Sequence, residues 1–287
     1  MPTNPAIAWL AKLSAPLSPK EYLLSQAATL LLKSNQVKPP YDPRKTLPSS
    51  VLRIETIPLS RDGMLIPING GFIIKLNSQK HPIRQRFVCA HEIAHTFFYD
   101  VSGPRPWRPT QSLSSYWAEE DLCYQFAEEM LMPNHEITRI ANELSPAINN
   151  FLRIRDIFGV SNESLSRRLA RLDLWRCIFI LLTSDSDPAI LKRKTVVCKH
   201  RDYKEFSLNW YTLLSLRSLF HTAIAEPVAV KTSTLSGHDL FRRGGQRDKW
   251  RVEFLVSTNS ITQTSLIIIT PAQDDHTISA MDDIPKL

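Results

Sequence analysis

The chain has 287 residues, of which 43% are hydrophobic and 22% charged, and its formal net charge is +7. These proportions are typical of a globular protein and exclude a disordered one. No apolar run approaches the roughly 20 residues of a membrane span, and the first five residues lack the basic and apolar regions of a signal peptide. Four cysteines without Cys-x-x-Cys spacing favour reduced thiols. We therefore expect a cytoplasmic protein with no membrane contact.

The first predicted helix begins at Ser18, where Ser18, Pro19 and Glu21 form a capping box. We expect its apolar stripe to pack against the helix predicted at 87–99; the stripe consists of Tyr22, Leu23, Ala27, Leu30 and Leu31. A proline-rich segment follows, and strands are predicted near 51–57 and 71–77.

An apolar segment of about three turns, 87–99, carries the pentapeptide His91-Glu92-Ile93-Ala94-His95. With 8 histidines in the chain, chance would place such a pentapeptide on the order of 0.01 times. On a helix, residues four apart share a face, so His91 and His95 can bind one metal ion with Glu92 beside it. The alternative is a pair of hydrogen-bonded core histidines next to a solvated glutamate. The spacing favours a metallopeptidase helix.

A catalytic zinc site needs a third protein ligand. The next acidic cluster lies in a helical pattern from 117 to 132, which ends at Pro133. On a helical wheel, Glu119 and Glu120 fall within or at the edge of the apolar arc, and Asp121 points away. Periodicity does not choose between the two glutamates.

The segment 136–176 has helical patterns broken at 158–161, as in a helix-turn-helix unit. We expect its basic face to be a solvated face of packed helices; DNA binding is the alternative. From 177 to 287, short strands are predicted at 177–183, 195–199, 228–232, 250–257 and 265–270, with a helix at 208–221. This pattern predicts a mixed α/β domain, for which we expect a sensory or partner-binding role.

The sequence at 86–95, together with Glu120-Asp121-Leu122-Cys123-Tyr124-Gln125-Phe126-Ala127 and Leu131-Met132-Pro133, resembles the ImmA/IrrE family of zinc metallopeptidases. The Glu-x-Leu-Cys form is similar to that of the family's radiation-response regulator. The resemblance extends over residues 18 to 175. It implies that the carboxylate six residues before Phe126, Glu120, is the third metal ligand beside His91 and His95.

The resemblance also implies the fold and the activity. The expected fold class is α+β, with a zincin-like metallopeptidase domain at 1–135, the helix-turn-helix-like extension at 136–176 and the C-terminal domain at 177–287. The expected function is a cytoplasmic zinc endopeptidase with Glu92 as general base. Its expected substrate is a helix-turn-helix DNA-binding repressor, whose cleavage derepresses stress-response or mobile-element genes. Zn2+ is the expected cofactor, and Mn2+ would also fit the site in vitro.

In zincin-like peptidases, the strand before the metal helix is often a sheet edge that pairs with extended substrate. We therefore expect the strand at 71–77 to bind substrate, with Ile74 and Leu76 as contact residues; an ordinary core strand is the alternative. The residue that stabilises the oxyanion stays open among His81, Tyr99 and Tyr116.

Residues 190–251 contain 13 Lys or Arg against 5 Asp or Glu, a balance of 13 − 5 = +8. Such a surface attracts nucleic acid or an acidic partner, and non-specific solvation is the alternative. A second functional class is therefore a regulator that binds nucleic acid or protein, with a structural or vestigial metal site. An intact Glu92 favours the enzyme, because a purely structural site needs no general base.

Overall fold

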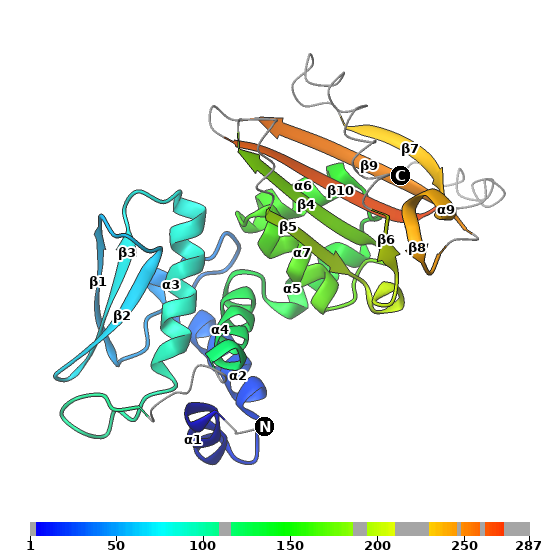
Figure 1. Ribbon diagram of the computed structural model, residues 1–287. Coiled ribbons are helices and arrows are strands. Elements are labelled where there is room, and N and C mark those ends of the chain that lie inside the picture. The colour runs from blue at the N-terminus through cyan, green and yellow to red at the C-terminus, as the bar shows by residue number, and fades with distance from the viewer. Residues whose placement is uncertain are drawn as a thin grey trace, which may run out of the picture. The chain divides into compact units, whose positions relative to one another are not determined.

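The computed structural model describes residues 4–108, 116–185, 194–209, 230–245, 248–258 and 262–272 (Figure 1). The chain divides into two compact units, one of Met1–Ile140 with Ile154–Ser164 and one of Ala141–Arg153 with Leu165–Leu287. Residues of the helical segment 136–176 belong to both units, and its three helices have nine to eleven residues.

The first unit contains a three-stranded sheet of β1 (Val51–Ile57), β2 (Gly63–Ile68) and β3 (Gly71–Asn77). Its strand order is β1-β3-β2, with β3 parallel to β1 and antiparallel to β2. The strands predicted near 51–57 and 71–77 are confirmed. The sequence did not indicate β2, because Pro67 interrupts its apolar run and reads as a strand breaker.

The expectation that the strand at 71–77 is a sheet edge is wrong. β3 is the central strand, so its backbone groups pair with β1 on one side and β2 on the other. Ile74 and Leu76 are both fully buried and are not available to a substrate. Burial on both faces explains why the sequence of this strand alternates only partly. The two edge strands of this sheet are β1 and β2.

Helix α3 (Pro82–Thr96) packs against β2 and β3, and α4 (Tyr116–Leu131) packs against α3 (Figure 1). Helix α2 (Pro19–Lys33) has the predicted capping box: Ser18 accepts from the Glu21 amide, and Glu21 accepts from the Ser18 amide. We expected its apolar stripe to pack against α3, but α2 packs mainly against α4. At the end of α3, the ring of Phe97 packs edge-on against Tyr22 of α2. Among the aromatic contacts of the described residues, this pair alone joins α2 to that end of α3.

Short elements complete this unit. Helix α1 (Pro5–Ser14) is capped by Asn4, and η1 (Pro43–Lys45) is a single 3-10 turn that lies next to α3. Three helices with residues in both units follow α4: α5 (Asn134–Asn142), α6 (Ile148–Phe158) and α7 (Asn162–Arg171). The predicted break between α6 and α7 contains Gly159, whose φ of 60° favours glycine. A Cβ there would also lie 2.8 Å from an Arg86 guanidinium nitrogen.

The second unit is built on a five-stranded antiparallel sheet in the order β5-β4-β10-β9-β7. Its strands are β4 (Ile178–Asp185), β5 (Lys194–Lys199), β7 (Lys231–Ser236), β9 (Lys249–Thr258) and β10 (Thr262–Pro271). β6 (Ser207–Leu208) pairs with β8 (Phe241–Arg243), near the short helices η3 (Arg201–Tyr203) and α9 (Gly237–Leu240). Four of the five predicted strands are present as β4, β5, β9 and β10. The strand predicted at 228–232 coincides with β7 only at 231–232, and residues 228–229 lie outside the described part of the chain. The helix predicted at 208–221 lies, beyond residue 209, outside the described residues.

An apolar cluster that includes Trp250, Phe241 and Tyr203 forms the core of the second unit. The structure therefore confirms a mixed helix-and-strand fold. No helix in the described ranges combines the length and hydrophobicity that crossing a lipid bilayer requires.

Candidate metal and catalytic site

Helix α3 places the two histidines of the pentapeptide on one face, as their spacing requires. The helix begins at Pro82, where the missing amide proton costs no hydrogen bond, and His81 caps it. The Nε2 atoms of His91 and His95 lie 3.1 Å apart. Both side chains are mostly buried, with 12% and 13% of their surface exposed. Two buried imidazoles thus face each other through the nitrogen atoms that commonly bind metals.

Glu120 on α4 completes the group. Its carboxylate oxygens lie 3.2 Å from His91 Nε2 and 3.4 Å from His95 Nε2. Ligand atoms about 2.0–2.1 Å from a tetrahedral metal lie about 3.3 Å from one another. The three observed distances agree with that spacing, so this donor set of two imidazoles and a carboxylate fits a metal such as zinc.

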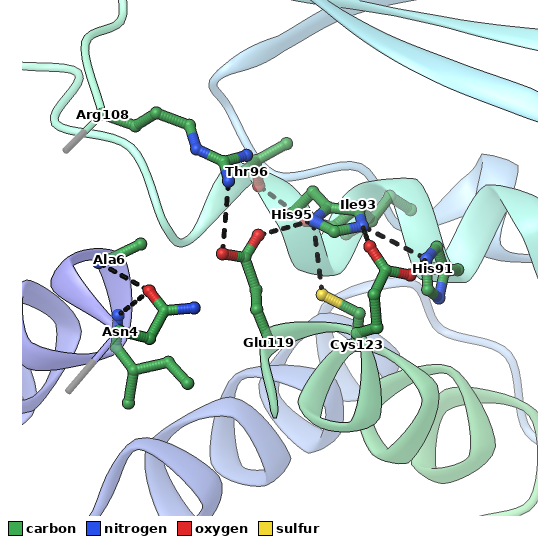
Figure 2. Close-up of polar contacts among 11 residues, drawn as sticks. Asn4, Ala6, His91, Ile93, His95, Thr96, Arg108, Glu119 and Cys123 are labelled. Atoms are coloured by element: carbon green, nitrogen blue, oxygen red, sulfur yellow. Dashed lines mark hydrogen bonds and ion pairs between the residues drawn. The ribbon is translucent and has the colours of Figure 1, made fainter. Parts of the chain in front are cut away.

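Glu119 lies on the other side of His95 and is 1% exposed. One of its oxygens is 3.0 Å from His95 Nδ1, and Cys123 Sγ is 3.5 Å from the same nitrogen. Figure 2 shows the His95 ring between these two side chains and His91. His95, Glu119 and Cys123 are a second group whose donor atoms lie close enough for one metal ion. Asp121, by contrast, is exposed, as the helical wheel predicts.

The surroundings shift the pKa values of the three nitrogen and oxygen donors in different directions. Burial lowers the pKa of His91. Burial also acts to lower the pKa of His95, but Cys123, Glu119 and Glu120 outweigh it and raise that pKa well above its usual value. For Glu120, burial acts to raise the pKa, and the hydrogen bonds with His91 and His95 outweigh it and lower the pKa. The group therefore already contains a carboxylate and one neutral imidazole at neutral pH.

Glu92 lies between the histidines in sequence and faces strand β2. A Cβ built on Gly63 would be 3.5 Å from a Glu92 carboxylate oxygen. The backbone amide of Leu65 also interacts with this carboxylate. Burial raises the pKa of Glu92, Glu120 acts in the same direction, and His95 opposes them. A carboxylate with a raised pKa is a better proton acceptor in catalysis at neutral pH than an ordinary one.

The three candidates for an oxyanion partner lie in different places. His81 caps the start of α3, about 15 Å along the helix from His91 at 1.5 Å per residue. Tyr99 packs against Phe72 and under the Arg108 guanidinium. Tyr116 alone of the three interacts with the site: burial and the neighbouring Glu120 carboxylate raise the pKa of its hydroxyl group. The structure thus brings Tyr116 to the candidate metal ligands and leaves His81 and Tyr99 away from them.

Two residues at the site were not among the sequence candidates in these roles. The side chain of Cys123 is fully buried, and its sulfur lies 3.5 Å from His95 Nδ1. Arg108 forms an ion pair with Glu119 at 3.3 Å. The helical spacing of four between Glu119 and Cys123 is a signal for a shared face, whereas nothing in the local sequence points to Arg108.

Comparisons with known proteins agree with this geometry. Residues 57–170 match the model of the IrrE N-terminal-like domain, a peptidase family, and this segment includes both helices of the site. A comparison with curated proteins found no match. Among solved structures, a Mycobacterium tuberculosis transcriptional regulator has a similar fold, with 14% sequence identity, a TM-score of 0.52, and coverage of 92% of this chain and 93% of that chain. The resemblance drawn from the sequence is therefore confirmed, as a match to the IrrE N-terminal-like domain over residues 57–170.

Proposed function

We propose that the protein is a zinc-dependent endopeptidase in which His91, His95 and Glu120 hold the metal. The observation that carries the proposal is the convergence of their donor atoms at 3.1, 3.2 and 3.4 Å. A bound zinc ion would supply Lewis acidity and lower the pKa of a water molecule to about 7. Mn2+ binds carboxylate ligands and is expected to occupy the same site in vitro, with a lower affinity than zinc.

Glu92 acts as the general base and then as the general acid. Its carboxylate lies among His95, Glu120 and the amide of Leu65, so it belongs to the same polar cluster. It takes the proton of the attacking water and passes it to the leaving amine of the cleaved peptide bond. Tyr116, next to Glu120, is the described side chain best placed to donate a hydrogen bond to the carbonyl oxygen as negative charge develops there.

Strand β2 takes the substrate-binding role that the sequence had assigned to Ile74 and Leu76. It is the sheet edge that lies along α3, and all six of its residues are partly exposed. An extended peptide paired with this edge would pass Glu92, because Gly63 and Leu65 of β2 both lie at that carboxylate. The edge therefore supports endopeptidase activity, in which the substrate chain continues on both sides of the cleaved bond.

The proposed substrate is a helix-turn-helix DNA-binding repressor, whose cleavage would derepress stress-response or mobile-element genes in the cytoplasm. This part of the proposal rests on the ImmA/IrrE resemblance. The similar mycobacterial structure is called a transcriptional regulator, which is consistent with a role in gene control but, at 14% identity, supports the fold alone.

The competing proposal is a regulator that binds nucleic acid or protein through residues 190–251, with a structural or vestigial metal site. Several basic groups of this segment are already engaged: Lys199 donates to backbone oxygens, and Arg201 and Arg251 pair with Asp173 and Glu253. In the helix-turn-helix-like segment, Arg168 is 2% exposed. These contacts favour a structural role for part of the basic charge and give the enzyme the stronger support.

Purified repressors of the helix-turn-helix class, incubated with the zinc-loaded protein, test the proposal. We expect defined fragments by mass spectrometry with the wild type, and none after chelation or with Glu92→Gln. Loss of cleavage in chelated protein should be reversed by added zinc. Equal cleavage by wild type and Glu92→Gln would show that Glu92 is not the base. Repressor binding without cleavage by the zinc-loaded wild type would favour the regulator.

A further inference from the structure

The side chain behind His95 suggests a role that the pentapeptide does not contain. Glu119 is 1% exposed, and its two oxygens face different partners. One lies 3.0 Å from His95 Nδ1, and the other lies 3.3 Å from an Arg108 guanidinium nitrogen (Figure 2). A buried carboxylate is stable only where both oxygens are hydrogen-bonded or paired, so these contacts fix its orientation.

We propose that Glu119 is a positioning residue of the metal site and that Arg108 holds it in place. The inference rests on the proposed metal site at His91, His95 and Glu120. A carboxylate that accepts the Nδ1 proton of His95 keeps the Nε2 lone pair free to point at the metal. It also stops the ring from turning over about its Cβ–Cγ bond, which would exchange the two faces of the imidazole.

The two histidines differ in how they are supported. His91 Nδ1 is buried and has no hydrogen-bond partner among the described residues. His95 Nδ1, in contrast, faces both Glu119 and the weaker acceptor Cys123. Of the two histidine rings, His95 is therefore the one that a hydrogen bond at Nδ1 orients. Removal of Glu119 should consequently weaken metal binding strongly.

Arg108 extends this support into the segment between α3 and α4. Its guanidinium lies 5.3 Å from the centre of the Tyr99 ring, in a cation-π contact. One residue earlier, Trp107 pairs with Asp100 through two backbone hydrogen bonds of 2.7 and 2.9 Å. The segment 99–108 thus holds Arg108 from two sides, and Arg108 in turn holds Glu119.

The zinc dissociation constant, measured by chelator competition, tests the inference in the full chain. Loss of a carboxylate behind a metal-bound histidine typically weakens metal binding by about 10–100-fold. We expect Glu119→Ala to lose zinc affinity by that factor and Glu119→Gln, which keeps an acceptor oxygen, to lose less. Arg108→Met should weaken zinc binding several-fold, because the arginine side chain that it replaces is 25% exposed. Arg105→Met, at an exposed arginine of the same segment, is the matched control and should bind zinc as the wild type does.

A second readout does not depend on zinc. In the metal-free protein, a hydrogen-bonded Nδ1 proton of His95 should give a downfield proton resonance that exchanges slowly with water. We expect it to be lost in Glu119→Ala and kept in Arg105→Met. Zinc binding by Glu119→Ala within about twofold of wild type, or an unchanged resonance, would overturn the inference. Failure of the wild type to bind zinc would instead contradict the proposed function, and the resonance would still decide the role of Glu119.

Discussion

The close approach of β2 to α3 makes Gly63 a sensitive position. A methyl group added there would lie 2.4 Å from Val88 Cγ1 and 3.1 Å from the backbone oxygen of Lys75. Carbon atoms in contact prefer about 3.5–4.0 Å, so the strand and the helix would have to separate by about 1 Å. Val88 is β-branched and 5% exposed, so its side chain has little freedom to turn away.

We therefore predict that Gly63→Ala lowers the free energy of unfolding around α3 by about 1–3 kcal/mol, the usual cost of overpacking. Glu92 is only 3.5 Å from the added methyl, so displacement of β2 should also lower kcat/KM, by up to about 100-fold for a 1 Å misplacement. Val88→Ala removes the clashing atom. The double variant should consequently be more stable than the sum of the two single effects predicts.

Hydrogen exchange of the α3 backbone amides in increasing urea measures this stability, and single-substrate kinetics measure the activity. The exchange method is suitable because the chain has two units and need not unfold in one step. A Gly63→Ala protein with stability within about 0.5 kcal/mol of wild type would refute the close approach. Strict additivity in the double variant would refute the assignment of the clash to Val88.

Two further predictions concern protons and thiols at the site. Because the pKa of His95 is raised, His95 keeps a proton that zinc must displace, whereas His91 and Glu120, whose pKa values are lowered, are already deprotonated. The apparent zinc affinity should therefore fall about tenfold per pH unit below the pKa of His95. Titrations at several pH values check this, and a pH-independent affinity would contradict it. Burial raises the pKa of Cys123 to about 11, so iodoacetamide should not modify this thiol in the native protein at pH 7. Mass spectrometry of native and unfolded samples measures the labelling, and rapid native labelling would show that Cys123 is accessible.

The sequence predicts helices α3 and α4 well because both carry strong periodic signals. The pentapeptide fixes two donors on one helical face, and α4 occupies Tyr116–Leu131 against the predicted 117–132. The helical wheel does not decide whether Glu119 or Glu120 is the third ligand, because both lie near the same apolar arc. In the structure both are indeed buried, and they lie on different sides of His95. Only the direction from which α4 meets α3 separates them, and local sequence does not encode that direction.

The position of a strand within the sheet could not be predicted from the sequence. The run at 71–77 has an apolar composition that fits either an edge or a central strand. Its position in the sheet depends on β2, whose Pro67 obscures the strand pattern in the sequence. Arg108 is a similar case, because its ion pair with Glu119 connects residues 11 apart in the sequence that no helical spacing relates. Long-range pairing of this kind follows from the packed fold and not from spacing.

The central claim is that His91, His95 and Glu120 form the metal site, with Glu92 beside it. Anomalous X-ray diffraction at the zinc absorption edge, on crystals of zinc-loaded Glu92→Gln, tests it most directly. We predict one strong peak about 2.0–2.1 Å from the Nε2 atoms of both histidines and about 2.0–2.2 Å from a Glu120 oxygen. A peak next to His95 Nδ1, Glu119 and Cys123 instead, or no peak at α3, would contradict the account.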